Sequence, residues 1–285
     1  MPEPQPATLY VVGTPLGNLE DISARAIRIL REVDRIAAED TRHTGRLLQA
    51  LGVTTPQISY HEHNRSQRTP EILERLGRGE SLALVSDAGV PAISDPGQEL
   101  VAAVAAAGFT VVPVAGPCAA IAALCASGLP TDRFAFEGFL PAKSKARREV
   151  LAALARDART LVFYESPHRL RETLADLAVE FGGDRPCALA RELTKLHEEI
   201  WRGSLGAAVA LYAERQPQGE YTLVIGGAAP QPEADLSEAQ LTQELAALLR
   251  QGRSRSDASR ELAERTGLPR KPIYRLALAL PDPEE

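Results

Sequence analysis

The stretch "SLALVSDAGVPAISDPGQELVAAVAAAGFTVVPVAGP", residues 81–117, contains the pattern that decides the fold. An apolar run, "SLALVS", is followed by a loop rich in Gly and Pro, by the helix-like segment "GQELVAAVAAAG" and by a second apolar run, "TVVPVAG". Short apolar runs that alternate with helical segments are typical of βα units in a parallel sheet. We therefore expect an α/β protein with a mostly parallel sheet.

The same alternation extends to both sides of this stretch. Upstream, "LYVVGT" and "RIAAED" are predicted strands, and "ISARAIRILREV" and "TGRLLQALG" are predicted helices; downstream, a second series runs from "RFAFEGF" to "EYTLVIGG". The last three strands of the second series have only a short helix between them, which favours a mixed sheet. We predict an N-terminal α/β domain (1–116), a C-terminal α/β domain (117–228), a linker (229–236) and a helical module (237–285).

Composition excludes several classes of protein. The chain has 285 residues, a net charge of −6 and 44% hydrophobic residues, so it is neither disordered nor basic overall. Its three cysteines, Cys118, Cys125 and Cys187, have no CxxC spacing, and they support neither a disulfide framework nor a metal site. Without a signal-like N-terminus or an apolar run near the roughly 18 residues of a membrane span, we expect an unprocessed, soluble, cytoplasmic protein and no membrane partner.

Positive charge is concentrated in two regions. From Arg250 to Arg275, eight lysines and arginines face three carboxylates, and two short predicted helices flank a turn at Gly267-Leu268-Pro269, as in a helix-turn-helix. This module is either an RNA contact or a solvated hairpin. The helix "AKSKARRE" is either an RNA-facing patch or a solvated face. The candidate RNA contacts are Lys143, Lys145, Arg147, Arg148, Arg253, Arg255, Arg260, Arg270 and Lys271.

Three loops at predicted strand ends are rich in small residues. Ligands of open α/β sheets bind at the carboxyl ends of the strands, and there lie "VVGTPLGNLEDIS", "SDAGVPAISDPG" and "PVAGPCAAI". In the second loop we expect Asp87 to face a ligand and Asp95 to cap the following helix. Neither GxGxxG nor GxxxxGK[ST] is present, so the loops suit a folded cofactor with a cationic centre better than a dinucleotide or a polyphosphate.

Nine blocks of sequence between Leu9 and about Gly227 resemble the small-subunit (16S) ribosomal RNA 2′-O-ribose methyltransferase I family of the tetrapyrrole-methylase superfamily. They include "VVGTPLGNLEDIS", "AEDTRHT", "SDAGVPAISDPG", "FEGFLPAK", "YESPHR" and "ARELTKLHEE". The resemblance implies two α/β domains with S-adenosylmethionine in the cleft between them, and a homodimer. It also implies methylation of the ribose 2′-oxygen of a cytidine in the decoding centre of 16S rRNA. The substrate and partner would be the 16S rRNA or the small ribosomal subunit. By position, the cofactor contacts would be Gly13, Pro15, Asp87, Ala88, Gly89, Pro91, Ser94, Ala115, Gly116, Leu140, Pro141 and Thr222.

A ribose hydroxyl is a weak acid, so we expect a general base or a nearby cation to assist the transfer. The sequence leaves the choice open. The block "HEHN" holds His61 and His63 but no third metal ligand, while Asp40 and His168 also fit capping or surface roles. The candidates are Asp40, Arg42, His43, Glu165, His168, Arg169, Arg191, Glu192 and Lys195, together with Glu39, His61, His63 and Asn64.

Two other functions remain open at this point. A methyltransferase acting on a small tetrapyrrole would share the cleft and the cofactor, but it would not need the basic C-terminal module. A non-catalytic regulator would use the helix-turn-helix to bind DNA and the α/β part to sense a small molecule, without turnover.

Overall fold

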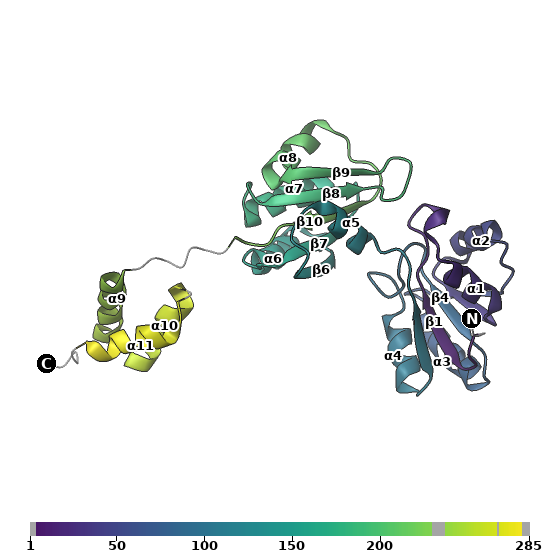
Figure 1. Cartoon of the computed structure of the whole chain (residues 1–285), viewed down its shortest axis with the longest axis horizontal. Helices are drawn as coiled ribbons and strands as arrows, with labels where there is room; N and C mark the ends of the chain where they lie inside the picture. Colours follow the sequence, from purple (N-terminus) through teal and green to yellow (C-terminus); the bar gives the residue numbers. More distant parts are fainter. Residues whose placement is uncertain (1–3, 230–236, 267, 281–285) are drawn as a thin grey trace. The chain divides into compact units, whose positions relative to one another are not determined.

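The computed structural model describes residues 4–229, 237–266 and 268–280. The chain divides into two compact units, Met1–Gly227 and Ala228–Glu285. Of the predicted linker, residues 230–236 lie outside the described residues, as does Gly267 of the predicted turn. The first unit contains two five-stranded sheets, each covered by helices (Figure 1).

The first sheet has the strand order β3-β2-β4-β1-β5, and all its pairs are parallel, which confirms the prediction of a mostly parallel sheet. Its elements are β1 (Thr8–Val12), the 3-10 helix η1 (Leu19–Asp21), α1 (Ala24–Glu32), β2 (Arg35–Ala38), α2 (Thr41–Ala50), β3 (Gln57–Ser59), α3 (Arg65–Gly77), β4 (Leu82–Val85), α4 (Gln98–Ala106) and β5 (Thr110–Val114).

Helices pack on both faces of this sheet because its central strands β1, β2 and β4 are mainly apolar and buried. On one face, Ile29 and Leu30 of α1 and Leu48 of α2 join a buried core. On the other face, α3 and α4 pack through residues such as Leu76 and Leu100. Ser23 begins α1 as its N-cap, since its side chain accepts a hydrogen bond from the Ala26 N–H. The sequence did not predict β3 and α3.

The second sheet has the order β6-β7-β10-β8-β9 and is mixed, as predicted, because only β6 and β7 are parallel. Its strands are β6 (Phe134–Phe139), β7 (Thr160–Glu165), β8 (Pro186–Arg191), β9 (Glu199–Ser204) and β10 (Tyr221–Ile225). One face is covered by α6 (Ser144–Leu154), α7 (Leu170–Phe181) and α8 (Leu205–Glu214).

The other face of the second sheet is covered by α5 (Ala119–Ser127). Ala120, Ala123 and Leu124 of this helix pack against alternate strand residues such as Val162 and Val224. α5 begins three residues after Gly116 and packs on the second sheet, while the two sheets belong to one compact unit, so the domain boundary at residue 116 stays a prediction.

The second unit is a small helical module with its own core. It consists of α9 (Glu238–Arg250), α10 (Arg255–Thr266) and α11 (Arg270–Ala279), which pack through residues such as Leu245, Leu262 and Ile273. The two predicted helices correspond to α10 and α11, whereas α9 was not predicted. A capping box of Ser237 and Gln240 begins α9. No helix among the described residues has the length and apolar character needed to span a membrane.

Candidate functional site

The three small-residue loops meet at the carboxyl edge of the first sheet. Thr14 and Gly89 exchange two backbone hydrogen bonds, with N···O distances of 2.8 and 3.1 Å, which join the loop after β1 to the loop after β4. The loop after β1 also approaches the loop after β5 so closely that a Cβ added at Gly13 would lie 2.8 Å from the Gly116 Cα. The chain needs glycine at both positions because backbone contacts backbone here.

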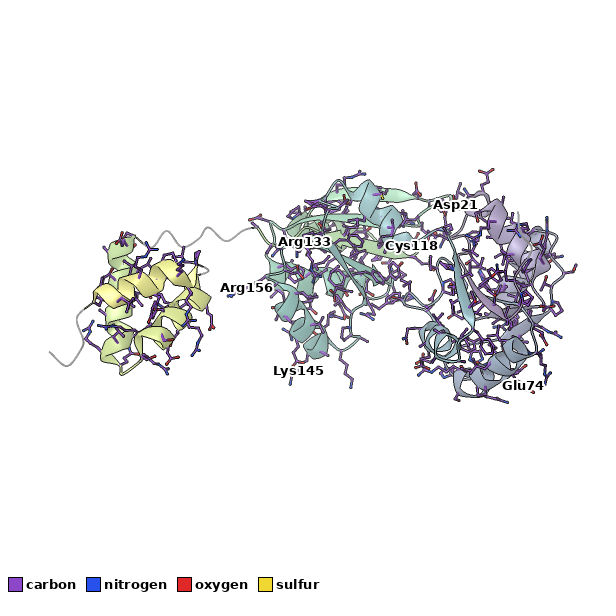
Figure 2. The ribbon with its side chains drawn as sticks, turned by 60° about the horizontal axis from the view of Figure 1, so that its bottom comes forward. Asp21, Glu74, Cys118, Arg133, Lys145 and Arg156 are labelled. Carbon is purple, nitrogen blue, oxygen red and sulfur yellow. The ribbon has the colours of Figure 1, made fainter. Side chains whose placement is uncertain are left out.

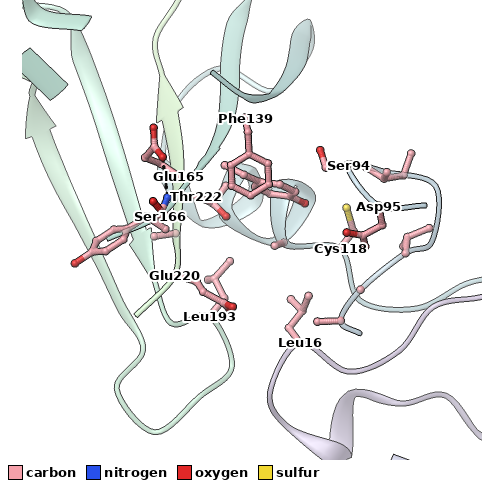
Figure 3. Close-up of a pocket in the computed structure, with 18 of the residues that line it drawn as sticks. Leu16, Ser94, Asp95, Cys118, Phe139, Glu165, Ser166, Leu193, Glu220 and Thr222 are labelled. Atoms are coloured by element: carbon pink, nitrogen blue, oxygen red, sulfur yellow. Dashed lines mark hydrogen bonds between the residues drawn. The ribbon is translucent and has the colours of Figure 1, made fainter. Parts of the chain in front are cut away.

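A pocket of about 440 Å³ lies beside these loops and is closed on its other side by the second sheet. Figure 3 shows Ser94, Asp95 and Cys118 on one wall and Phe139, Glu165 and Thr222 on the opposite wall. This volume lies in the range of about 300–1,000 Å³ that is typical of small-molecule sites. The lining residues are Leu16, Ala88, Gly89, Val90, Ile93, Ser94, Asp95, Cys118, Ala119, Phe139, Tyr164, Glu165, Ser166, Pro167, Ala190, Leu193, Glu220, Tyr221 and Thr222.

The charged side chains of the pocket are all acidic. Among the described residues that line it, Asp95, Glu165 and Glu220 are carboxylates and none is a lysine or arginine. Glu165 is buried and accepts hydrogen bonds from the Ser166 N–H (2.8 Å), the Thr173 hydroxyl (2.6 Å) and an Arg169 N–H (3.2 Å). A pocket with this charge suits a ligand that carries positive charge and disfavours a polyphosphate.

Asp95 differs from the other two carboxylates because it has no ion pair among the described residues. Burial raises the pKa of its carboxyl group, and the negative charge of Asp87 adds to the increase. The prediction that Asp95 caps the next helix was wrong. Gly97, with φ +142°, occupies the N-cap of α4 without a side-chain hydrogen bond, and Asp95 lines the pocket instead.

Asp87 connects the pocket loop to the end of β2. Its Oδ1 accepts a hydrogen bond from the Asp40 N–H (3.2 Å), while its own N–H donates to Glu39 Oε2 (3.4 Å). Burial raises the pKa of Glu39, and the charges of Asp95, Asp87 and Asp40 raise it further. Asp87 is not among the residues that line the pocket, so its contact with a ligand stays a prediction.

Tyr164 forms the wall that the second sheet contributes. Its hydroxyl accepts a hydrogen bond from the Ala120 N–H (3.2 Å) at the start of α5, and its ring meets Phe136 and Phe139 edge-on. Burial raises the pKa of Tyr164 to about 12, so the hydroxyl stays protonated at neutral pH. The ring is therefore a fixed, neutral surface.

The connection from β8 to β9, residues 192–198, crosses from the second sheet to the loop after β1. Leu193 lines the pocket, and the Lys195 ammonium pairs with Glu192 (3.1 Å) and Glu220 (2.7 Å). The Lys195 side chain lies directly over Gly17, where an added Cβ would be 2.3 Å from the Lys195 Cγ. Two residues of this connection, Glu192 and Thr194, have positive φ.

The structure brings together only part of the predicted cofactor set. Ala88, Gly89, Ser94 and Thr222 line the pocket. The remaining eight lie in the loops or strand ends around it without lining it: Gly13, Pro15, Asp87, Pro91, Ala115, Gly116, Leu140 and Pro141. Reasoning from the sequence missed Cys118, Phe139, Tyr164 and Leu193, although the last three stand in the blocks "FEGFLPAK", "YESPHR" and "ARELTKLHEE" that carry the family resemblance.

Most of the catalytic candidates are engaged with neighbours. Asp40 is the N-cap of α2, and hydrogen bonds from Arg42 hold its pKa well below its usual range. Arg169 donates to the Leu140 carbonyl (2.6 Å) and to Glu165, Arg191 donates to the Gln218 carbonyl (2.8 Å), and Glu192 pairs with Lys195. His43 and His168 are exposed and do not line the pocket; neither do His61, His63 and Asn64, although the His61 Nδ1 is buried without a hydrogen-bond partner.

Comparison with known proteins identifies the family. The model of the tetrapyrrole (corrin/porphyrin) methylases matches residues 8–209. The ribosomal RNA small subunit methyltransferase I of Synechocystis is 55% identical over 272 residues, which span 95% of this chain and 98% of that protein. The protein of the same name from Escherichia coli O157:H7 is 47% identical, spanning 95% of this chain and 94% of its own. This chain belongs to the ribosomal RNA small subunit methyltransferase I family.

The fold of this methyltransferase I family member is shared with methylases of small molecules. A uroporphyrin-III-C-methyltransferase from Thermus thermophilus matches with a TM-score of 0.57 at 24% identity, over 78% of this chain and 95% of its own. A cobalt precorrin-4 methyltransferase matches with a TM-score of 0.56 at 17% identity, over 77% and 95%. At these identities the likeness concerns the fold, and it confirms the predicted tetrapyrrole-methylase architecture.

The basic side chains near and on α6 differ in exposure and in ion pairing, so only some of them are available to RNA. The prediction that Arg147 contacts RNA was wrong, because this side chain is buried under α7 and pairs with Asp176 at 2.7 Å. Lys143 and Lys145 are exposed, and Figure 2 shows Lys145 projecting from α6. Arg148 is half-exposed and lies 4.0 Å from Asp176.

In the second unit, several of the predicted RNA contacts have local partners. Arg253 pairs with Glu261 and Arg260 with Asp257, while Arg255 donates to the Leu280 carbonyl and Arg270 to Ser256. Lys271 and Arg275, both on α11, are exposed and have no ion pair among the described residues. Cations without a carboxylate partner in the described part of this unit therefore include Arg270, Lys271 and Arg275 on α11 and Arg250 at the end of α9.

Proposed function

We propose that this protein transfers the methyl group of S-adenosylmethionine to the ribose 2′-oxygen of a cytidine in the decoding centre of 16S rRNA. It would act on RNA or on the small ribosomal subunit, as a homodimer in the cytoplasm. The observation that carries the proposal is an acidic pocket between the strand-end loops and the second sheet. That pocket occurs in a chain whose relatives are named small subunit methyltransferase I.

The pocket suits S-adenosylmethionine in charge and in surface. The ligand carries a sulfonium and an ammonium, which the acidic lining complements, above all through Asp95, which has no ion pair among the described residues. It also carries an apolar adenine face, which Leu16 and Ile93 complement. The hydroxyl group of Thr222, which lines the pocket, can hydrogen-bond to the polar edges of the ligand. The acidic lining also argues against a nucleotide cofactor, whose phosphates would meet carboxylates.

When bound, S-adenosylmethionine supplies an electrophilic methyl group on a positively charged sulfur. The protein's largest contribution is to hold the 2′-oxygen in line with that methyl group, because fixed orientation alone provides much of the rate in such displacements. The loops at Thr14, Gly89 and Gly116 are suited to this role because their geometry is set by backbone contacts.

The hydroxyl proton needs an acceptor, and the pocket carboxylates differ in their capacity for it. Glu165 already accepts three hydrogen bonds, and Glu220 is paired with Lys195. Asp95 has no cation partner among the described residues, and its raised pKa makes it a better base than an ordinary aspartate. Asp95 therefore replaces the candidates from the sequence as our choice for the group that receives the proton.

RNA would be held by the exposed cations. Lys143 and Lys145 lie near the start of α6, and Lys271 and Arg275 lie on α11. Changing Lys271 or Arg275 to glutamine should lower the slope of log affinity against log salt by roughly one for each phosphate that the variant no longer neutralises. Arg265→Gln is the matched control, because Arg265 is already paired with Glu244.

The decisive experiment is transfer of labelled methyl from S-adenosylmethionine to small ribosomal subunits that lack this modification, followed by mass mapping of the labelled nucleotide. A 2′-O-methyl group on one decoding-centre cytidine is the expected result. Label on a base, on another nucleotide or on a tetrapyrrole would refute the proposed reaction. Light scattering on the same preparation tests the dimer, since a monomeric mass would remove that part of the proposal.

A further inference from the structure

Phe139 is an exposed aromatic residue at the cofactor pocket. It ends β6, lines the pocket and leaves 55% of its surface exposed. Ile93, from the loop after β4, also lines the pocket and is 43% exposed. Single large apolar side chains are common on protein surfaces and need no explanation. Two of them at the same pocket form an exposed apolar patch at its entrance.

Neighbouring aromatic side chains support the Phe139 ring on the side away from solvent. It meets Tyr164 edge-on, with ring centroids 5.6 Å apart, and Tyr164 in turn contacts Phe136 at 4.9 Å. The Tyr164 hydroxyl is bound to the Ala120 N–H. A ring supported at its edge by a fixed neighbour, with more than half its surface free, is preorganised to receive another flat group.

The residues after Phe139 supply charge. Lys143, four residues further along, is exposed and has no ion pair among the described residues, and the exposed Lys145 follows on α6. One short connection thus places an apolar ring at the pocket and ammonium groups beyond it. A nucleotide has the same two parts, a flat base and a phosphate, joined through its ribose.

We propose that Phe139 is a stacking platform for the nucleobase of the RNA nucleotide whose ribose enters the pocket. The inference rests on the proposed function, which requires a ribose to reach the methyl donor. A base inside folded RNA cannot bring its sugar into such a pocket unless it leaves its stack, and an aromatic platform compensates for the stacking that the base gives up. The adenine of S-adenosylmethionine has the same chemistry, so the experiment must separate the two bases.

The test compares Phe139→Ala, Phe139→Leu and Phe139→Trp in the full-length protein. For the alanine variant, we expect the KM for small subunits to rise roughly 5- to 100-fold, as for loss of one stacked base. Its Kd for S-adenosylmethionine, measured by calorimetry, should stay within about twofold of wild type. Tryptophan should restore the KM and leucine should not, because only tryptophan offers a flat π surface.

Phe134→Ala is the matched control. Phe134 begins the same strand, is 38% exposed and does not line the pocket, so its KM should stay at the wild-type value. A fall in cofactor affinity for Phe139→Ala would assign the platform to the adenine and overturn the proposal. A change of oligomeric mass in that variant, or rescue by leucine as complete as by tryptophan, would also overturn it.

A readout without turnover separates this inference from the proposed reaction. A short single-stranded RNA carrying the fluorescent base pyrrolocytidine should be quenched on binding wild type and the tryptophan variant, but not the alanine variant, because stacking quenches it. If quenching depends on Phe139 while no methyl is transferred to any subunit, the reaction is wrong and the platform stands. If methyl is transferred but quenching does not depend on Phe139, the platform is wrong.

Discussion

Gly17→Ala tests how the β8–β9 connection is fixed over the loop after β1. The added methyl carbon would lie 2.3 Å from the Lys195 Cγ, 2.9 Å from Cε and 3.1 Å from Cδ. Nonbonded carbon atoms do not repel each other at separations of about 3.5 Å or more, so either the added Cβ or the Lys195 Cγ must move by about 1.2 Å. Cγ is close to the main chain and the ammonium is held by Glu192 and Glu220, so the lysine cannot simply swing away.

Overpacking of this kind costs about 1–3 kcal/mol. The cost should appear as a lower free energy of unfolding in urea. It should also weaken the affinity for S-adenosylmethionine in calorimetry, because Leu16 and Leu193 line the pocket beside the two residues. In the double variant Gly17→Ala/Lys195→Ala the obstructing side chain is gone, so most of the loss should be recovered, with a coupling of at least about 1 kcal/mol.

Gly45→Ala is the control for the change of residue type. It lies in α2, and its added Cβ would meet only Gln57 Nε2, at 3.5 Å. Alanine there should be neutral or stabilising by up to about 1 kcal/mol, since glycine is a poor helix former. Additive effects of Gly17→Ala and Lys195→Ala would refute the reasoning, because they would mean that the two side chains do not meet.

Three further variants test other features. Asp95→Asn should raise the midpoint of thermal unfolding at neutral pH. Because the pKa of Asp95 is raised in the folded state, its ionised form destabilises the fold at pH values above that raised pKa. The gain from asparagine should therefore vanish at pH values below the ordinary aspartate pKa, where the carboxyl group is protonated in both states. A gain that does not depend on pH would contradict this reasoning. Arg147→Ala should cost about 3–5 kcal/mol in urea unfolding because it removes the buried guanidinium that pairs with Asp176 and leaves that carboxylate with the more distant Arg148 as its cation among the described residues, whereas a loss below about 1 kcal/mol would mean that the buried pair does not stabilise the fold. Gly13→Ala should lower stability by about 1–3 kcal/mol and weaken cofactor binding, because its Cβ would press on the Gly116 backbone; wild-type values for both would show that the loops can separate.

The fold was predictable where hydrophobic periodicity is strong. The βα alternation from "LYVVGT" to "TVVPVAG" predicted a parallel sheet, and the close spacing of the last three strands predicted a mixed one. β3 was missed because it has only three residues, and α3 because its sequence is polar and contains Pro70. α9 was missed because its first turn continues the polar composition of the linker.

The site was predictable at the level of loops but not of side chains. Strand-end loops rich in glycine indicated where a ligand binds, yet the two Ser-Asp pairs of one loop gave no sign of which aspartate lines the pocket. The basic run of α6 likewise conceals that Arg147 lies on the face of Leu151, four residues later, and is buried with it. Phe139 stands in the block "FEGFLPAK", directly before the predicted contacts Leu140 and Pro141, but only the tertiary fold shows that its ring lines the pocket.

The Thr14–Gly89 link has a consequence for how the pocket can diversify. The link is made by main-chain atoms, so it does not depend on which side chains stand nearby. The neighbouring Gly13–Gly116 contact, in contrast, requires that neither residue has a side chain. Most substitutions in these loops would therefore either leave their backbone unchanged or disrupt it. The pocket surface itself is built from side chains, such as Asp95 and Cys118 on the side of these loops and Phe139 and Thr222 on the other. Gradual change in what the pocket accepts can therefore accumulate in these side chains while the backbone frame behind them keeps its form, which gives protein engineers one part to redesign and one to leave untouched.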